Sequence, residues 1–556
     1  MNNNLNNKPS PLNFLVVGFV TLLIVSLAVF YWIFGKNSPS FVVSNSQPRA
    51  AIFVPKFSPA MVSLMVNPDA LQKIAQKREL SQIKNSLLAK SNINYQDDLK
   101  PWLNNEITLA VTTLDIDRDP DNGLQTGYLM ALATKNPVKS REFLELLFSK
   151  RAFAGNNLEI ERYKGVKVIY DHLDDHQEYS PSQISNSLAG AIVNNFVLFA
   201  NHPQVIKTAI NNLQAPDLNL VSSLEYQKAS QQIPKNSLAV TFFNLPEISK
   251  WQKLELAEST YHSQILSLAL NSQGLLAEST FLTNSLVPPS LPLSQPVPAL
   301  QYIPESTTLA ISGANLSNLG NSDLAKLWKQ GTATIYGSSE DGISRLIQPL
   351  IKIQQNLNLN FSQDIFSWVT REYALALLPN SENTTPNWVF IVEKTPQLAA
   401  GIAHLDNIAS SSGFNVISLI LNGQKVSAWT QIITTNENNK PINIDTKVKG
   451  VHTTLNNYEI FTSDLNILKE ILSQKQRSLL ENPKFKNSLA VIPQPNQGYI
   501  YLDWENSQNI LKRQLPVLKF VELLDKPLFD NLQALTFSSY HTQPGIVTGG
   551  VFLQLH

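Results

Sequence analysis

An internal duplication constrains the fold of this chain more than any other feature of its sequence. Residues 98–110 read DLKPWLNNEITLA and residues 364–376 read DIFSWVTREYALA, so both segments fit D-x-x-x-W-x-x-x-E-x-x-L-A without a gap. Further matches follow in the same order and at nearly constant spacing, which chance would not produce. We therefore predict an α+β fold in which two homologous repeats each form an antiparallel sheet with packed helices.

The shared motif places a tryptophan and a glutamate at equivalent positions of the two repeats. These residues are Trp102 with Trp368, and Glu106 with Glu372. We expect each Trp to pack at a junction between helix and strand. We expect each Glu to hold a nearby backbone or basic group, and the alternative is contact with a ligand.

Hydrophobic periodicity and turn residues give the elements of the repeats. Helical patterns cover residues 69–90, 140–151, 203–212 and 246–256, and alternating patterns typical of strands include 107–114 and 127–134. Short turns join strands that are adjacent in sequence, for example at Gly165 and Gly423, which favours antiparallel pairing.

Near its N-terminus the chain carries a long uncharged segment. Residues 14–34 read FLVVGFVTLLIVSLAVFYWIF, which is long enough to cross a hydrocarbon core of about 30 Å as a helix. The segment ends in aromatic residues followed by Lys36, as at a membrane interface, and not in the small residues of a cleavage site. We predict an uncleaved signal anchor, a single-pass transmembrane helix that places the body outside the cytoplasm.

These features divide the chain into six parts. The second repeat is preceded by a segment with five prolines between Pro288 and Pro298, which favours an extended linker. The predicted boundaries are a tail at 1–13, the transmembrane helix at 14–34, a tether at 35–50, the first repeat at 51–284, the linker at 285–299 and the second repeat at 300–556.

Composition excludes several classes of function. Lys and Arg total 43, as do Asp and Glu, so the net charge is zero and the chain lacks the basic field of a nucleic-acid-binding protein. It contains no cysteine, which excludes disulfides, thiolate catalysis, zinc–thiolate sites and iron–sulfur clusters. We therefore expect no nucleic-acid partner and no cofactor.

The strongest metal-site pattern in the sequence is a short acidic segment with two histidines. Asp171, His172, Asp175 and His176 lie close together, and imidazoles four residues apart can share one helical face. The second repeat has no histidine at the equivalent place, and the segment follows a strand as a loop would. We therefore interpret it as a solvated acidic loop, with a metal site as the weaker hypothesis.

A second acidic segment resembles a calcium-binding loop. Asp115, Asp117, Asp119 and Asp121 alternate as the ligands of such a loop do, but Gly123 comes one position late for it. The required glutamate at the twelfth position is also missing, so a hairpin turn is the better interpretation. No nucleophile elbow, dinucleotide fingerprint or Walker loop occurs in the chain.

Residues 51–71 read AIFVPKFSPAMVSLMVNPDAL. With the preceding hydrophobic segment and the paired Trp motifs, this stretch resembles the DUF3352 family of cyanobacterial membrane-anchored proteins. The resemblance implies a plasma or thylakoid membrane of a photosynthetic bacterium, with the body in the periplasm or lumen. It supplies no catalytic residues.

Together these patterns favour a membrane-anchored extracytoplasmic binding or assembly protein that is not catalytic, although they leave enzymatic activity open. Its expected partners are the lipid bilayer, through residues 14–34, and membrane, periplasmic or lumenal proteins. Two alternatives remain: an extracytoplasmic hydrolase with a site between the repeats, and a carrier of an apolar ligand.

Overall fold

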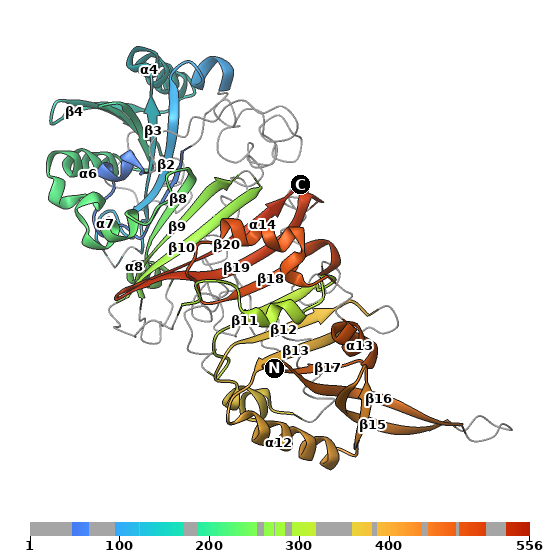
Figure 1. Ribbon diagram of the computed structural model, residues 1–556. Helices are drawn as coiled ribbons and strands as arrows, with labels where there is room; N and C mark the ends of the chain where they lie inside the picture. Colours follow the sequence, from blue (N-terminus) through green and yellow to red (C-terminus); the bar gives the residue numbers. More distant parts are fainter. Residues whose placement is uncertain are drawn as a thin grey trace, which may run out of the picture. The chain divides into compact units, whose positions relative to one another are not determined.

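The computed structural model describes most of the chain after residue 46 (Figure 1). The described residues are 47–65, 95–119, 121, 123–171, 187–252, 261–271, 273–283, 292–317, 359–380, 386–435, 443–473, 477–507 and 530–556. The chain divides into two compact units. The first comprises residues 1–270 and 277–286, and the second comprises residues 271–276 and 287–556.

In the first unit, the strands that follow one another in sequence are not always neighbours in the sheet. Strand β7 follows β6 in the chain but also pairs with β3, and β1 lies between β2 and β8. The spatial order is β4 (Leu158–Tyr163), β5 (Val166–Asp171), β6 (Ala189–Val193), β7 (Phe196–Ala200), β3 (Gly127–Thr134), β2 (Leu103–Thr113), β1 (Ala60–Leu64), β8 (Ser237–Asn244), β9 (Tyr261–Asn271) and β10 (Gly274–Thr283).

The second unit repeats this order when ten is added to each strand number. Thus β17 pairs with β13, and β11 lies between β12 and β18. The spatial order is β14 (Asn415–Leu421), β15 (Gln424–Thr435), β16 (Asn443–Leu455), β17 (Tyr458–Thr462), β13 (Asn387–Glu393), β12 (Tyr373–Leu378), β11 (Leu309–Gly313), β18 (Tyr499–Asp503), β19 (Leu532–Gln543) and β20 (Ile546–Leu555).

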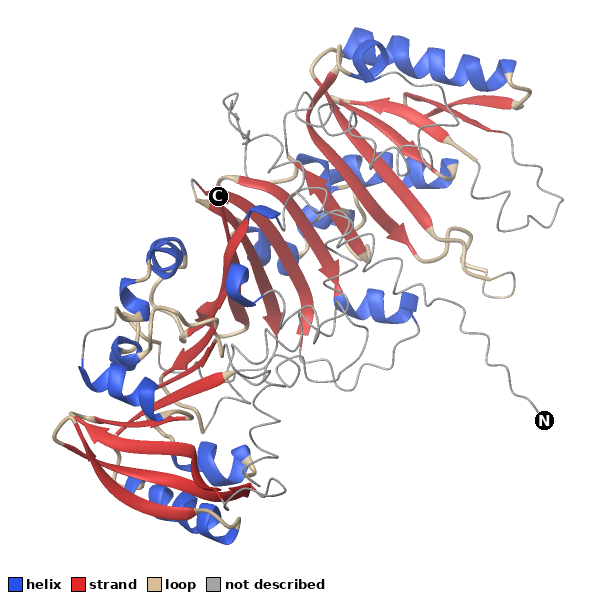
Figure 2. Ribbon diagram, turned by 90° about the vertical axis from the view of Figure 1, so that its right-hand side faces the viewer, coloured by secondary structure: helices blue, strands red, loops and turns tan. Residues whose placement is uncertain are grey.

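Helices cover both faces of the first unit's strands, as the blue and red ribbons of Figure 2 show. Helix α4 (Pro137–Phe153) packs on the face that carries Leu132, whereas α6 (Pro203–Gln214) packs on the face that carries Ala131. Adjacent strand residues point to opposite faces, so these are two separate cores. The other described helices of this unit are the 3-10 helices η1 (Arg49–Phe53), η4 (Pro216–Leu218) and η5 (Leu220–Ser222), the π-helix η3 (Tyr95–Leu99), α7 (Leu224–Ser230) and α8 (Leu245–Gln252).

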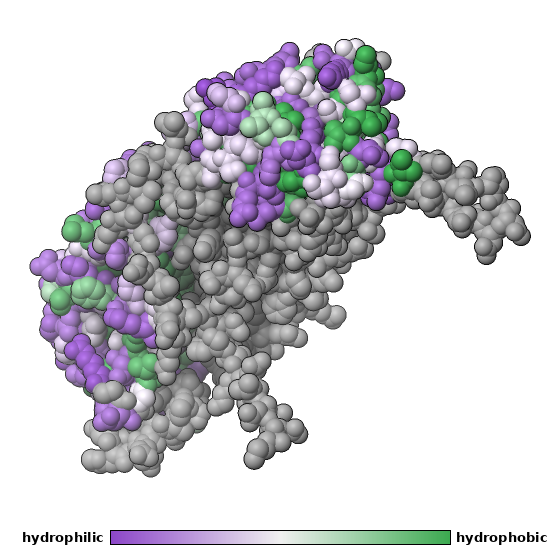
Figure 3. All heavy atoms as spheres, turned by 90° about the horizontal axis from the view of Figure 1, so that it is seen from below, coloured by the Kyte–Doolittle hydropathy of each residue, from purple (hydrophilic) through white to green (hydrophobic). Residues whose placement is uncertain are grey.

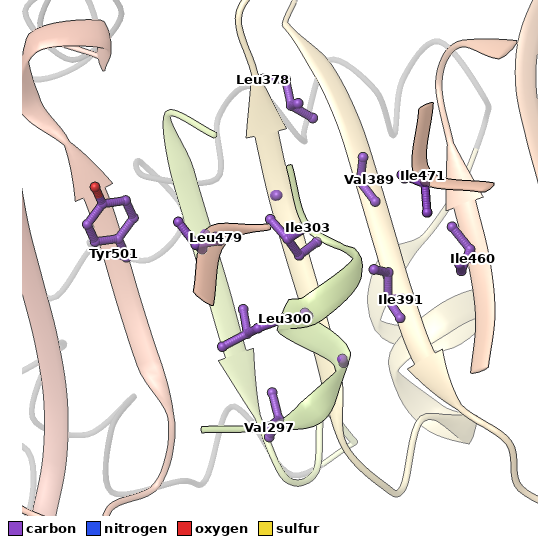
Figure 4. Close-up of a cluster of buried hydrophobic side chains, with 14 of the residues drawn as sticks. Val297, Leu300, Ile303, Leu378, Val389, Ile391, Ile460, Ile471, Leu479 and Tyr501 are labelled. Atoms are coloured by element: carbon purple, nitrogen blue, oxygen red, sulfur yellow. The ribbon is translucent and has the colours of Figure 1, made fainter. Parts of the chain in front are cut away.

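The second unit is built in the same way, with α12 (Leu398–Ser411), α13 (Leu465–Ser473), α14 (Pro483–Val491) and the 3-10 helix η6 (Pro298–Tyr302). Figure 4 shows part of its hydrophobic core, in which the aliphatic side chains of η6 meet those of the strands. Val297, Leu300 and Ile303 come from η6 and its ends, and Val389 and Ile391 come from β13. This core fixes the sheet on which the candidate site is built.

Local signals in the sequence explain where elements begin and turn. The Asn136 side chain accepts a hydrogen bond from the Lys139 N–H, and Pro137 occupies the first position of α4, as is typical of a helix start. In the β4–β5 hairpin, Lys164 and Gly165 have φ of 47° and 84°. Two successive positive φ angles form the tight turn whose twist matches paired strands, and a glycine lowers its strain.

The predicted fold class is wrong in one respect that the sequence pattern could not reveal. We predicted two repeats with one antiparallel sheet each, but the twenty strands of the described residues belong to one twenty-stranded antiparallel sheet. The last strand of a hairpin leaves unpaired N–H and C=O groups, which another strand can satisfy. Hydrophobic periodicity in the sequence identifies such strands, but it does not identify which strand pairs with their free edge.

The predicted transmembrane helix also has no counterpart among the residues that the structure describes. None of the helices in the described ranges is long and apolar enough to cross a bilayer. Residues 14–34 themselves lie outside those ranges, as does the helix predicted at 69–90.

The described end of the linker predicted at 285–299 packs against the second unit at some of its residues. Val297 and Ala299 are fully buried in the core of the second unit. Upstream, the backbone of Leu293 exchanges hydrogen bonds with that of Asn496, at N–O distances of 2.6 and 3.0 Å. The tether predicted at 35–50 likewise ends inside the fold, because Ala50 is buried in the first unit. Val297 and Ala299 are thus packed, whereas Pro292 and Pro298 of the same segment are exposed.

Candidate functional site

The two motif tryptophans occupy matching places and make the same hydrogen bond. The indole N–H of Trp102 donates to the Asp98 carbonyl at 2.6 Å, and that of Trp368 donates to the Asp364 carbonyl at 2.7 Å. Trp102 is fully buried and packs on Phe143 of α4 with ring centroids 5.2 Å apart, whereas Trp368 is half-buried. Both side chains serve packing in this geometry.

The two motif glutamates hold the start of a 3-10 helix in each unit. Glu106 accepts hydrogen bonds from the Ala50 N–H at 2.7 Å and from Arg49 Nε at 3.2 Å. Glu372 accepts from the Ala299 N–H and from the Tyr458 hydroxyl. Burial raises the pKa of both carboxyl groups above the ordinary value, despite these hydrogen bonds.

These glutamates predict a measurable pH dependence of stability. Because their pKa is higher in the folded than in the unfolded chain, their contribution is fully present below the ordinary glutamate pKa of about 4.3 and is lost as the pH rises through the raised value. We expect the free energy of unfolding to fall less between pH 4 and pH 7 in Glu106→Gln/Glu372→Gln than in the unmodified chain. Urea unfolding at the two pH values measures this, and equal pH slopes would contradict it.

The predicted metal site is only partly within the described residues. Asp171 ends β5 and is bound by Arg151 through both guanidinium Nε and Nη2, at 3.1 and 2.5 Å, while the Leu188 N–H donates to it at 2.8 Å. His172, Asp175 and His176 lie outside the described ranges. Asp171 is therefore engaged in an ion pair at the end of α4.

The calcium-like segment is the loop of the β2–β3 hairpin, as predicted. Its carboxylates close turns: Asp117 accepts the N–H of Asp119 and Asp119 accepts that of Asp121, each at 3.0 Å. Asp115 accepts the N–H of Gln125 across the loop. Across the described residues, no group of three His, Asp or Glu side chains is placed to hold a metal ion.

The second unit contains a buried polar network that sequence reasoning missed. His452 of β16 is buried, and its Nδ1 lies 2.7 Å from Oε1 of Glu459 on β17. The Thr454 hydroxyl donates to the other oxygen of Glu459 at 2.5 Å. On the far side of the ring, Nε2 lies 3.4 Å from Oδ1 of Asp406 on α12, and that oxygen accepts the Trp429 indole N–H at 2.7 Å.

In the observed geometry, this network is placed neither to bind a metal ion nor to act as a general base. The two carboxylates face different nitrogens of one imidazole, so they cannot share a metal ion with it. His452 Nε2 is fully buried and has no hydrogen-bond partner among the described groups. A general base must reach a substrate proton. The network instead ties α12 to β15, β16 and β17, and the ring of His452 stacks on Phe461 with centroids 5.3 Å apart.

The sequence held one signal of this network. At the equivalent strand positions, the first unit has Gly190 and Val197, whereas the second has His452 and Glu459. The first unit fills the space with apolar side chains, since a Cβ on Gly190 would come within 2.7 Å of Phe148. A polar pair where the other repeat has Gly and Val marks a difference in environment between the two copies.

The network lies beneath an exposed edge of the sheet. β14 pairs with β15 alone among the described strands, and Val416 of β14 lies directly opposite Trp429. β14 reads NVISLIL and carries no charge, and Ile420 and Ile417 are 80% and 43% exposed. Uncharged edge strands present free N–H and C=O groups to other chains.

The corresponding edge of the first unit is protected. β4 pairs with β5 alone among the described strands but reads LEIERY, so charged residues alternate with its apolar ones. Glu161 of this strand also forms an ion pair with Lys207 at 2.8 Å. Charged side chains are the usual means of blocking edge-to-edge pairing. The two units therefore differ at the same edge.

Hydrophobic side chains also reach the surface elsewhere. Figure 3 shows them in green among hydrophilic residues in purple on the described part of one face. Phe57 is highly exposed, as are Leu218 and Leu224, and the Lys56 N–H donates to the Leu218 carbonyl at 2.8 Å, which places these segments side by side.

Comparisons with known proteins give a family but no activity. A family model described as "Protein of unknown function (DUF3352)" matches residues 15–555. No curated protein matches the chain. Two solved structures, described as crystal forms I and III of TP0453, match with TM-scores of 0.25 and 0.23 and identities of 9% and 10%. Each covers 43% of this chain, and 81% and 82% of the other chains are covered.

Proposed function

The chain belongs to the DUF3352 family, and we propose that it is a non-catalytic binding or assembly protein that uses the β14 edge of its second unit as a docking site. The observation that carries this proposal is the uncharged sequence of β14 combined with its exposure. Apolar side chains on a monomer's sheet edge are a liability for aggregation unless a partner uses them. Addition of a strand to such an edge is a common mode of protein recognition.

The buried network supports this proposal because it makes the edge rigid. Asp406 joins α12 to Trp429 on β15, and the Thr430 hydroxyl donates to the Asn415 carbonyl on β14 at 3.2 Å. These contacts fix the strands next to the edge from the helix side. A rigid edge loses little conformational entropy when a partner binds, which favours affinity.

The location that we propose is a plasma or thylakoid membrane, with the body in the periplasm or lumen and other membrane or periplasmic proteins as partners. It is supported by the hydropathy of residues 14–34 in the sequence. Protease added to cells stripped of their outer membrane is expected to digest the body. Protection of the body would reverse this location, unless the protein resides in an internal thylakoid.

A matched pair of substitutions tests the docking site. Ile420→Glu places a charge on the β14 edge directly opposite Lys425, so pairing with β15 is retained. Ile160→Glu makes the same change on β4, where Ile160 is 66% exposed. In affinity purification from solubilised membranes, we expect Ile420→Glu to lose at least tenfold of the bound partner protein and Ile160→Glu to retain it.

Two results would contradict the proposal. If both variants retain the same partners, binding does not use β14. If the unmodified chain repeatedly purifies without any stoichiometric partner, as a homogeneous monomer, a binding or assembly function is itself contradicted.

A further inference from the structure

Building on the proposed function, we infer that the occupant of the β14 edge is an extended, uncharged segment of another protein, about seven residues long and aliphatic on both faces. It would add to the sheet as a further strand beside β14. The inference rests on the length, charge and side-chain pattern of β14. These determine what can pair with it.

The two faces of β14 set the side chains that a partner strand must supply. Residues opposite each other in an antiparallel pair share a face, so Val416, Ser418 and Ile420 lie on the face of Trp429, which α12 covers. Ile417 and Leu419 lie on the other face, opposite Ala428 and Val426, which belong to the main core. A partner strand therefore meets aliphatic neighbours on both faces and continues both cores.

The absence of charged residues in β14 disfavours partner segments that carry charge. No Asp, Glu, Lys or Arg lies in β14, so a charged residue in an added strand would find no opposite charge beside it on that strand. An ionised side chain that is partly desolvated without a partner weakens binding. Uncharged β-branched residues both avoid this cost and suit the strand conformation.

The size of the edge favours a segment of another protein over a second copy of this chain. β14 has seven residues and spans about 24 Å. With a sheet about 10 Å thick including side chains, the paired edge covers roughly 240 Å² of each partner. A stable dimer buries about 800 Å² per partner. A strand that belongs to another protein gains affinity from its backbone hydrogen bonds to β14. It therefore does not require a large complementary surface.

The test uses a defined peptide with the full-length chain. The probe is acetyl-Thr-Val-Val-Ile-Val-Val-Thr-amide, which is aliphatic on both faces of the strand, and two control peptides carry proline in place of the Val before the central Ile or of that Ile. Neighbouring N–H groups of a strand point to opposite sides, so one of the two prolines removes a ladder bond and both disturb the strand. Amide hydrogen exchange of residues 415–421 and of residues 158–163 is followed with each peptide.

We expect the probe at saturation to slow exchange within 415–421 by about tenfold or more, as new ladder hydrogen bonds form, without slowing exchange in 158–163. The proline peptides are expected to bind at least about tenfold more weakly, and Ile420→Glu is expected to abolish protection, whereas Ile160→Glu retains it. This comparison needs no natural partner.

Other outcomes overturn the inference in distinct ways. Binding without protection of 415–421 would place the peptide elsewhere. Absence of peptide binding would contradict an extended, uncharged segment as the partner. Loss of a natural partner in Ile420→Glu would still support the proposed function. Sedimentation equilibrium that shows a dimer abolished by Ile420→Glu would make a second copy of the chain the occupant instead.

Discussion

Replacing Trp102 with alanine is expected to lower the free energy of unfolding of the first unit by about 3–5 kcal/mol, the usual cost of truncating a fully buried tryptophan. The side chain is 1% exposed and fills the space between β2 and α4, against Phe143. Its indole N–H also satisfies the Asp98 carbonyl, which loses its donor in the variant. The cavity left by the indole ring and the lost hydrogen bond both lower the free energy of unfolding.

The equivalent substitution in the second unit provides the control. Trp368 makes the same hydrogen bond but is half-buried, so Trp368→Ala removes less buried surface and is expected to cost clearly less. Amide hydrogen exchange measures each unit separately in the full chain, with residues 137–153 reporting on the first and residues 398–411 on the second. A cost below about 1 kcal/mol for Trp102→Ala would show that Trp102 does not support the first core, and equal effects of the two substitutions would show that the difference in burial does not set the cost.

Local structure was predictable where the sequence carries strong signals. The strand predicted at 127–134 is β3 with the same bounds, and the helix predicted at 140–151 is α4, which starts earlier because Asn136 and Pro137 begin it. The turn at Gly165 was predictable for a similar reason, since few other residues adopt its positive φ. Such signals determine structure within a few residues of themselves, so they can be recognised in a single segment of the sequence.

Long-range pairing and buried charges were not predictable in this way. The pairing of β11 with β18 joins segments about 190 residues apart, and the sequence of neither strand specifies its partner. The burial of Val297 and Ala299 depends on a core that the whole second unit forms. The same holds for His452, whose neighbours come from α12, β15 and β17, elements that a sequence pattern places near one another only after the topology is known.

The buried network supports the second large prediction. His452→Phe keeps a ring of similar size against Phe461 but removes the nitrogen that Glu459 contacts, and Glu459 has a side chain that is only 2% exposed. A buried carboxylate left without its partner destabilises a protein by about 3–5 kcal/mol. We therefore expect His452→Phe to lower the stability of the second unit by this amount, measured by exchange of residues 451–462, and to leave residues 189–200 unchanged.

The first unit shows how the loss should be reversed. It has Val197 at the position of Glu459 and needs no carboxylate there, and replacing a buried charged pair by packed apolar residues is often neutral. His452→Phe/Glu459→Val is therefore expected to recover most of the stability that His452→Phe loses, because no stranded charge remains. If the double variant is as unstable as the single one, the cost arises from ring packing and not from Glu459. If full stability returns together with loss of partner binding at β14, the network is retained for a rigid docking edge, since an apolar replacement supports the fold equally well but removes the contact of His452 Nε2 with Asp406 of α12.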